Sequence, residues 1–241
     1  MGTKFRRATL TDVSGIAAVV YDVWEQDILA DVCKAQIQDD ACALWVAVDG
    51  DDVAGFVSAF LTVGVGGVRR WEVDLLAVRH VSRGRRLGQK LVLVACQDAA
   101  RHSVSVARAA IRADNVASQR TFDNAGFATD RRVHQLLLWT PRFGDSPDVC
   151  PRDVTLLPVD TVTYRGLWVE GLTSAGLGAE LQRDVVRTAR SVAAREERLN
   201  TGALIPADEA RLLAADLRDQ AGVHGEYYWF VKLILLAGAS I

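Results

Sequence analysis

Residues 83–91 read RGRRLGQKL and follow directly after the apolar run Val73 to Val78. This order predicts a strand, then a basic loop, then a helix that begins near Leu87. The first N–H groups of a helix have no partner within the helix, and the helix dipole adds partial positive charge there. Because Gly88 would let an anion approach the backbone, the stretch predicts a phosphate site. A basic surface turn without a ligand is the alternative.

A second segment, at residues 115–127, reads NVASQRTFDNAGF. Together the two segments resemble the GNAT superfamily of acyl-CoA N-acyltransferases. That family has a loop of the form Q/R-x-x-G-x-G/A and a later motif N-x-x-A/S-x-x-x-Y-x-x-x-G-F. The order and separation of both motifs fit over residues 1–145. Two positions depart from the pattern, because Arg86 replaces the first loop glycine and Phe122 replaces the tyrosine.

The resemblance implies an α/β fold with a central mixed, mainly antiparallel sheet flanked by helices. It also implies acetyl-CoA as cosubstrate, with no metal. The pantetheine arm is expected on the main chain of Leu76, Ala77 and Val78. The pyrophosphate is assigned to the loop residues Arg83, Gly84, Arg85, Arg86, Leu87, Gly88 and Gln89, and the later motif contributes Asn115, Ser118 and Phe122. An arginine at position 86 is tolerated if its backbone φ is negative, and it adds charge near phosphate.

Acetyl transfer to a lysine-like amine needs a base, because such an amine has a pKa near 10.4 and arrives protonated. Glu72 is the candidate, since it lies eleven residues (83 − 72) before Arg83, where the histone-type branch of the family carries its glutamate. Strand alternation places Glu72 and Asp74 on one face, which predicts that this face lines the cleft. A salt bridge to Arg69 or Arg70 is the alternative, and His134 is a reserve base.

Asn115 is expected to act on the pantetheine or on a catalytic water, with a plain helix N-cap as the alternative. Since Phe122 has no hydroxyl, the departing thiolate, of pKa about 8.5, would take its proton from water. The acceptor amine is expected beside the first two helices, where negative charge would attract it; a solvated helix face is the alternative. The acidic residues there are Asp22, Glu25, Asp27, Asp31, Asp39 and Asp40.

These residues predict an N-acetyltransferase that moves acetyl from acetyl-CoA to a primary amine by direct attack in a ternary complex. The acceptor is a small molecule or a peptide: a protein N-terminus, a lysine, a polyamine and an aminoglycoside all stay open. The alternative is a non-catalytic acyl-CoA-binding or assembly module derived from the same fold.

The composition of the 241-residue chain is that of an ordinary globular protein, and its net charge of −2 gives no reason to expect nucleic acid or a membrane as partner. Four cysteines, at positions 33, 42, 96 and 150, show no C-x-x-C spacing and predict buried thiols in a reducing compartment. With no apolar signal segment at the start, we expect a soluble cytoplasmic protein.

Hydrophobic periodicity predicts the elements of residues 1–145, the expected acetyltransferase domain. Strands are expected at 4–8, 43–48, 53–63, 71–78, 104–112 and 133–139, and helices at 13–28, 30–37, 87–100 and 116–124. The D-G pair at Asp49-Gly50 favours a hairpin between the second and third strands.

Residues 146–241 predict a smaller α/β domain, with strands at 161–169 and 227–236 and helices at 177–199 and 208–220. Leu177, Leu181, Val185, Ala189 and Val192 make one apolar helix face. Residues 173–178 fit T-x-x-G-x-G, and Gly176-Leu177-Gly178 parallels Arg86-Leu87-Gly88, which favours a degenerate partial repeat. Without basic side chains this second loop is expected to be empty. An unrelated extension that covers the sheet or forms a homodimer contact is the alternative.

Overall fold

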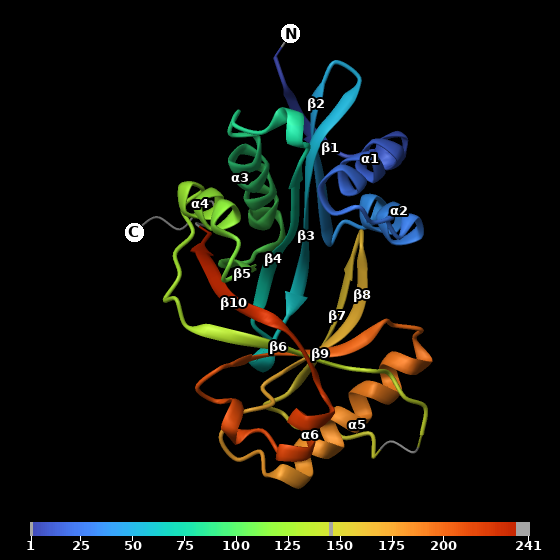
Figure 1. The fold of residues 1–241 in the computed structure, drawn as a ribbon, viewed down its shortest axis with the longest axis vertical. Helices are drawn as coiled ribbons and strands as arrows, with labels where there is room; N and C mark the ends of the chain where they lie inside the picture. Colours follow the sequence, from blue (N-terminus) through green and yellow to red (C-terminus); the bar gives the residue numbers. More distant parts are fainter. Residues whose placement is uncertain (1, 145–146, 235–241) are drawn as a thin grey trace.

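The computed structural model describes residues 2–144 and 147–234, and these form one ten-stranded sheet flanked by helices (Figure 1). The strand order is β1-β2-β3-β4-β5-β10-β6-β9-β8-β7. Neighbouring strands are antiparallel except for β4–β5 and β8–β9, which are parallel. The expected mixed, mainly antiparallel α/β sheet is confirmed.

Residues 2–144 supply the elements that the periodicity predicts, with bounds that differ by a few residues. The strands are β1 (Lys4–Arg7), β2 (Cys42–Asp49), β3 (Asp52–Val63), β4 (Arg69–Val78), β5 (Val106–Arg112) and β6 (Val133–Trp139). The helices are α1 (Val13–Trp24), α2 (Ala30–Gln38), α3 (Leu87–Ala99) and α4 (Val116–Asn124). Helices α3 and α4 lie on one side of the strands and α1 and α2 on the other (Figure 1).

Each face of this part of the sheet has its own apolar core. Trp71, Val73 and Leu91 belong to the core beneath α3 and α4, and Ile16, Val46 and Phe56 belong to the core beneath α1 and α2. Since neighbouring residues of a strand point to opposite faces, β4 contributes to both cores. The strand that carries the predicted base is therefore fixed from two sides.

The C-terminal part differs from its prediction in three elements. It contains β7 (Thr155–Thr161), β8 (Tyr164–Glu170), α5 (Ala179–Arg195), β9 (Asn200–Pro206), α6 (Ala215–Gln220) and β10 (Gly222–Leu233). Neither β7 nor β9 was predicted, and the helix predicted over 208–220 is only a 3-10 turn followed by α6. Pro158 argues against a strand in the sequence, because proline has no N–H to donate to a neighbouring strand. It is tolerated in β7 because β7 is the last strand at the edge of the sheet.

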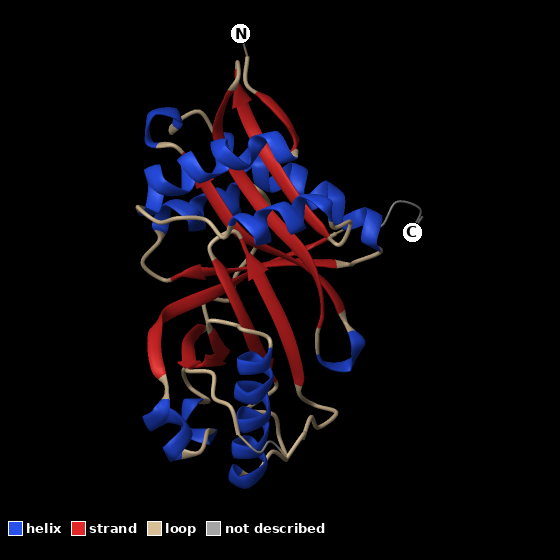
Figure 2. Cartoon of the chain, turned by 90° about the vertical axis from the view of Figure 1, so that its right-hand side faces the viewer, coloured by secondary structure: helices blue, strands red, loops and turns tan. Residues whose placement is uncertain are grey.

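The predicted apolar face of α5 packs against the sheet. Val185 and Ala189 are fully buried in a third core together with Leu167 and Ile205 of the strands beneath. This core lies at the opposite end of the molecule from α1 and α2 (Figure 2).

The eight strands after β2 follow the order β3-β4-β5-β10-β6-β9-β8-β7. If β3, β4, β5 and β6 are exchanged with β7, β8, β9 and β10, the same order is obtained when the sheet is read from its opposite edge. Each set places its last strand inside the other, because β10 lies between β5 and β6, and β6 lies between β10 and β9. This symmetry agrees with the repeat suggested by Gly176-Leu177-Gly178. The division into domains at residues 145 and 146 stays a prediction, and the strand exchange joins the two parts in one sheet.

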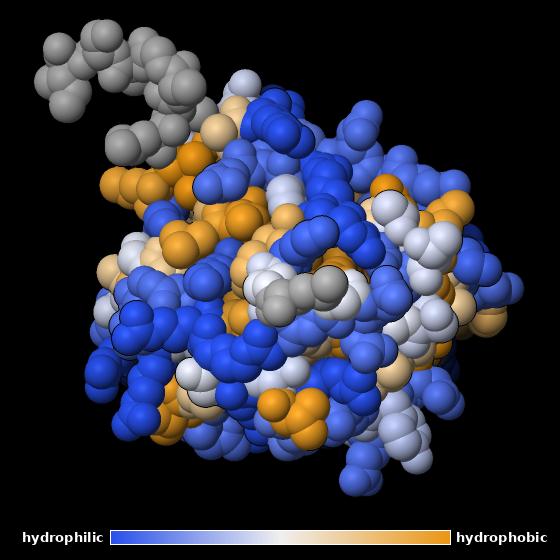
Figure 3. Space-filling view, turned by 90° about the horizontal axis from the view of Figure 1, so that it is seen from above, coloured by the Kyte–Doolittle hydropathy of each residue, from blue (hydrophilic) through white to orange (hydrophobic). Residues whose placement is uncertain are grey.

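Hydrophilic residues cover most of the end that carries β1, with hydrophobic residues in small groups between them (Figure 3). Within the described residues, no helix is long and apolar enough to cross a membrane.

Two of the four cysteines, Cys33 and Cys96, are buried, whereas Cys42 is partly buried and Cys150 is exposed. The expectation of buried thiols is therefore wrong for Cys150, which lies in the segment that leads to β7.

Candidate active site

The candidate site lies where β4 and β5 separate. The parallel pairing of these strands is confined to Trp71 with Ala107 and Glu72 with Arg108. Beyond this point β4 carries a bulge, because Val73 pairs with Ala59 whereas Leu76 pairs with Val57. A bulge adds one residue on one strand and bends that strand. Here the bent strand is β4, and its pairing with β5 ends at Glu72. An opening between two strands follows, with main-chain groups of β4 facing it.

A cavity of about 300 Å³ occupies this opening. It is lined by four predicted site residues, namely Leu76 from β4 and Asn115, Ser118 and Phe122 from α4. The side chain of Ala77 is buried beneath α1 and α2, and that of Val78 packs against the core on the α3 side. Ala77 and Val78 are therefore placed to offer main-chain groups rather than side chains.

The predicted phosphate loop connects β4 to α3. Arg86 is the N-cap of α3, and its carbonyl oxygen accepts the first helical hydrogen bond, from the N–H of Lys90 at 3.3 Å. The N–H groups of Leu87, Gly88 and Gln89 precede that bond and are left for another acceptor. A Cβ atom built on Gly88 would lie 3.5 Å from Leu76 Cδ2 and 3.3 Å from Thr121 Cγ2. The beginning of α3 is therefore adjacent to the cavity and to α4.

The φ of Arg86 is 59°, in the left-handed region, so the condition under which an arginine is tolerated there, a negative φ, is not met. A glycine reaches this conformation without strain, whereas other residues do so at a cost of about 1 kcal/mol. The family glycine that Arg86 replaces would fit this backbone. Arg86 therefore adds charge to the loop at the expense of backbone strain.

The side chains of the loop differ in how far they are already engaged. Arg85 bonds Asp49 and donates a 2.6 Å hydrogen bond to Thr3, which ties it to the β2–β3 hairpin. Arg83 donates from Nε to the carbonyl of Val78 at 3.3 Å. Within the described residues no ion pair engages Arg83 or Arg86. These two are better placed than Arg85 to meet a phosphate.

At the start of α4, the Asn115 side-chain oxygen accepts the N–H of Ser118 at 3.1 Å. The N-cap alternative is thus realised, while a catalytic role for Asn115 stays a prediction. Phe122 is 3 % exposed and packs edge-on against Phe127, with the ring centroids 5.0 Å apart. Its ring is held by the core at the cavity wall, in the place where the family carries a hydroxyl.

Glu72 is held by an ion-pair network. Arg108 Nε lies 2.8 Å from both of its carboxylate oxygens, and Thr62 donates a 2.7 Å hydrogen bond to one of them. Glu170 of β8 joins the network through Arg108 and through Arg70, at 2.7 Å. Burial raises the pKa of Glu170, but the charges of Arg108 and Arg70 outweigh it and lower the pKa overall. Glu72, which is only 8 % exposed, therefore forms the salt bridge that was the alternative, with Arg70 at 3.5 Å. The closer contact, at 2.8 Å, is with Arg108, which the sequence did not indicate.

Asp74 lines the cavity two residues further along β4. Its side chain is open to the cavity but lies deep within the protein. Burial raises the pKa of the Asp74 carboxyl to about 7, and the negative charge of Glu72 adds to the rise. A carboxyl with a pKa near neutral pH can take up and release a proton under ordinary conditions.

Other predicted residues lie outside the cavity. His134 is not among the residues that line the cavity, so it is not placed there as a reserve base. It is buried, its Nδ1 lies 2.9 Å from the carbonyl of Arg132, and burial lowers its pKa. Asp22 accepts hydrogen bonds from His80. None of Asp22, Glu25, Asp27, Asp31, Asp39 and Asp40 lines this cavity, whereas Asp31 and Asp39 line another, of about 280 Å³, beside α2. The acidic acceptor site stays a prediction.

Sequence reasoning missed the residues that close the far side of the cavity. These are the aromatic side chains of Trp24 at the end of α1, Tyr164 and Trp168 on β8, and Tyr227 on β10. Burial raises the pKa of Tyr164 to about 12, and the Tyr164 hydroxyl accepts a 3.1 Å hydrogen bond from Trp168 Nε1. Only the strand exchange brings β8 and β10 beside β4, so no local pattern could indicate these residues.

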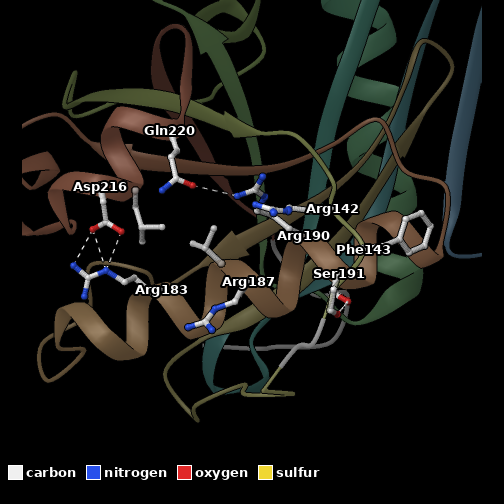
Figure 4. Close-up of a pocket in the computed structure, with 11 residues that line it drawn as sticks. Arg142, Phe143, Arg183, Arg187, Arg190, Ser191, Asp216 and Gln220 are labelled. Carbon is white, nitrogen blue, oxygen red and sulfur yellow. Dashed lines mark hydrogen bonds and ion pairs between the residues drawn. The ribbon is translucent and has the colours of Figure 1, made fainter.

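A second cavity, of about 450 Å³, lies between α5 and α6 (Figure 4). Arginines dominate its lining, and Arg142 and Arg190 lie next to each other. Its carboxylate, Asp216, bonds Arg183, whose hydrogen bond lowers the pKa of Asp216. This cavity offers no base, so the chemistry is assigned to the smaller one. Within the described residues, no group of His, Cys, Asp and Glu is arranged to hold a metal ion.

Comparison with known proteins identifies the family. Residues 12–127 match the model of the acetyltransferase (GNAT) family, whereas no protein of curated function matches the chain in sequence. A GCN5-related N-acetyltransferase from Sphaerobacter thermophilus is 16 % identical with a TM-score of 0.58, and the match covers 96 % of each chain.

Two further solved structures share the fold over nearly the whole chain. The GCN5-related glucosamine N-acetyltransferase region of a fungal multi-domain GH3 β-N-acetylglucosaminidase is 12 % identical, with a TM-score of 0.60 over 96 % of this chain and 38 % of that one. The ribosomal-protein-S18-alanine N-acetyltransferase from Escherichia coli is 8 % identical, with a TM-score of 0.51 over 100 % and 99 %. The motifs, the separated strands and the family match together show that residues 12–127 of this chain belong to the GNAT family of acetyltransferases.

Proposed function

We propose that the protein is an N-acetyltransferase that moves the acetyl group of acetyl-CoA to a primary amine by direct attack in a ternary complex. The observation that carries the proposal is the opening between β4 and β5, whose cavity is lined by Asp74, a carboxyl of raised pKa. The family match at residues 12–127 supports acyl transfer as the reaction class.

The thioester would bind along β4. Its pantetheine arm adds to the free edge that Leu76, Ala77 and Val78 present after the bulge, as an extra strand would. Its pyrophosphate meets the first N–H groups of α3, where Gly84 and Gly88 leave the backbone open and Arg83 and Arg86 supply charge.

Asp74 would act as the base in place of Glu72. The Glu72 carboxylate is committed to Arg108 and Thr62, whereas the Asp74 carboxyl faces the cavity. An ammonium that enters the cavity gives one proton to Asp74, and its nitrogen then attacks the thioester carbonyl. The carbon–sulfur bond breaks as the amide forms. The nitrogen gives its second proton to water, and the thiolate takes a proton from water, because Phe122 offers none.

Thiol release in the presence of a panel of amines tests the function directly. The proposal requires release that depends on the amine, together with acetyl-CoA binding at one site per chain. If acetyl-CoA binds but no amine stimulates thiol release, the proposed activity is refuted and a non-catalytic acyl-CoA-binding module remains. If acetyl-CoA does not bind, both are refuted.

A further inference from the structure

The wall of the cavity opposite the proposed thioester site is aromatic. Trp24, Tyr164, Trp168 and Tyr227 come from α1, β8 and β10, and each is half-buried. The Tyr164 hydroxyl is bonded to Asn200 and to Trp168 Nε1. These bonds fix two of the rings relative to each other, so the aromatic wall is formed before a ligand arrives. Preformed apolar walls with a few polar groups are typical of small-molecule sites.

Asp74 is the one carboxyl among the described residues that line this cavity. Arg112, the one cationic side chain in the lining, is bonded to Asp114 at 2.9 and 3.0 Å. The nearby carboxylates Glu72 and Glu170 are already neutralised by Arg108 and Arg70. The cavity can therefore compensate one ammonium, and a second buried ammonium would lack a partner.

The size of the cavity sets a further limit. About 300 Å³ is at the low end for ligand pockets, and the acetyl end of the thioester must share this space. The space that remains encloses only a small body, so most of a peptide or an aminoglycoside would lie outside the cavity. Aromatic walls favour a flat apolar body, and ring faces also attract an ammonium before it loses its proton.

We propose that the acceptor is a small molecule with a single primary amine on an aromatic or flat apolar body, such as an arylalkylamine. The ring packs among Trp24, Trp168 and Tyr227, and the amine lies toward Asp74. This inference rests on the proposed acetyltransferase activity, and it adds that β8 and β10, from the C-terminal part, select the acceptor.

Steady-state thiol release compares 2-phenylethylamine with n-butylamine, spermidine and a peptide with a free N-terminus, all with acetyl-CoA. We expect kcat/KM for 2-phenylethylamine to exceed that for each of the others by at least tenfold. Trp168→Ala should raise KM for 2-phenylethylamine about tenfold and remove its advantage over n-butylamine, while acetyl-CoA affinity is unchanged. Trp168→Phe, which keeps a ring, should retain most of the preference.

Calorimetry of 2-phenylethylamine binding to the complex of the protein with CoA separates the two hypotheses, because it requires no catalysis. If turnover fails but 2-phenylethylamine binds and Trp168→Ala weakens this binding, the proposed activity is refuted, and the aromatic wall is still shown to bind amines of this class. Faster acetylation of spermidine or of the peptide overturns the acceptor class and leaves the activity standing. If 2-phenylethylamine does not bind to the complex of the protein with CoA, the proposed acceptor class is likewise overturned.

Discussion

Replacing Asp74 by Asn tests the assignment of the base most directly. Asn keeps the shape and removes the proton acceptor, so we expect the turnover rate to fall by about 10²–10⁴ while acetyl-CoA affinity stays nearly constant. The base must be ionised to act. The wild-type rate should therefore rise with pH through an apparent pKa near 7, the pKa of the Asp74 carboxyl, and this acidic limb should disappear in the variant.

The same substitution has a consequence for stability. The pKa of Asp74 is raised from its ordinary value of 3.8 to about 7 in the folded protein, so ionisation of this carboxyl destabilises the folded state relative to the unfolded chain. Because the pKa is raised on folding, this destabilisation of the folded state is absent below pH 3.8 and complete above pH 7. Asp74→Asn should therefore stabilise the protein at pH 8 and much less at pH 5.

Denaturant unfolding at both pH values, beside pH–rate profiles with a saturating amine, measures the two effects. Glu72→Gln is the matched control on the same strand. It breaks the network with Arg108 and should lower the free energy of unfolding by about 3 kcal/mol, yet it should keep the acidic limb. An unchanged profile in Asp74→Asn, or loss of the limb in Glu72→Gln alone, would refute the reasoning and return the role to Glu72.

Three further predictions concern the loop and the C-terminal part. Gly88→Trp should abolish acetyl-CoA binding in calorimetry, because the indole would fill the space beside Leu76. Gly178→Trp, at the start of α5 where a Cβ meets nothing within 4 Å, should leave acetyl-CoA binding at one site per chain. Two acetyl-CoA sites in the wild-type chain would contradict the expectation that the second loop is empty. Arg86→Gly should raise the free energy of unfolding in urea by about 0.5–1 kcal/mol, since φ is 59° there; a loss of stability would show that the arginine makes a compensating contact. A fragment that ends at Gly144 should not give a cooperative thermal transition, because β5 and β6 would lose the strand between them; a folded, active fragment would refute this.

The sequence alone was informative wherever the signal is local. The basic loop and Gly88 predicted the beginning of α3, and Asn115 marked the start of α4, because helix starts depend on a few adjacent residues. The family resemblance also indicated the part of β4 where the site lies. These features need no knowledge of what packs against them.

The tertiary structure decided which carboxyl is free. Glu72 and Asp74 are equivalent in the strand alternation, but Arg108 from β5 and Glu170 from β8 engage Glu72 and leave Asp74 at the cavity. Such pairings join residues far apart in the chain, so spacing along one strand cannot reveal them. The strand exchange likewise placed Trp168 and Tyr227 at the cavity. Local residue types determined the helices and the basic loop before α3, whereas the long-range pairing of strands determined which carboxyl faces the cavity and which aromatic side chains line it.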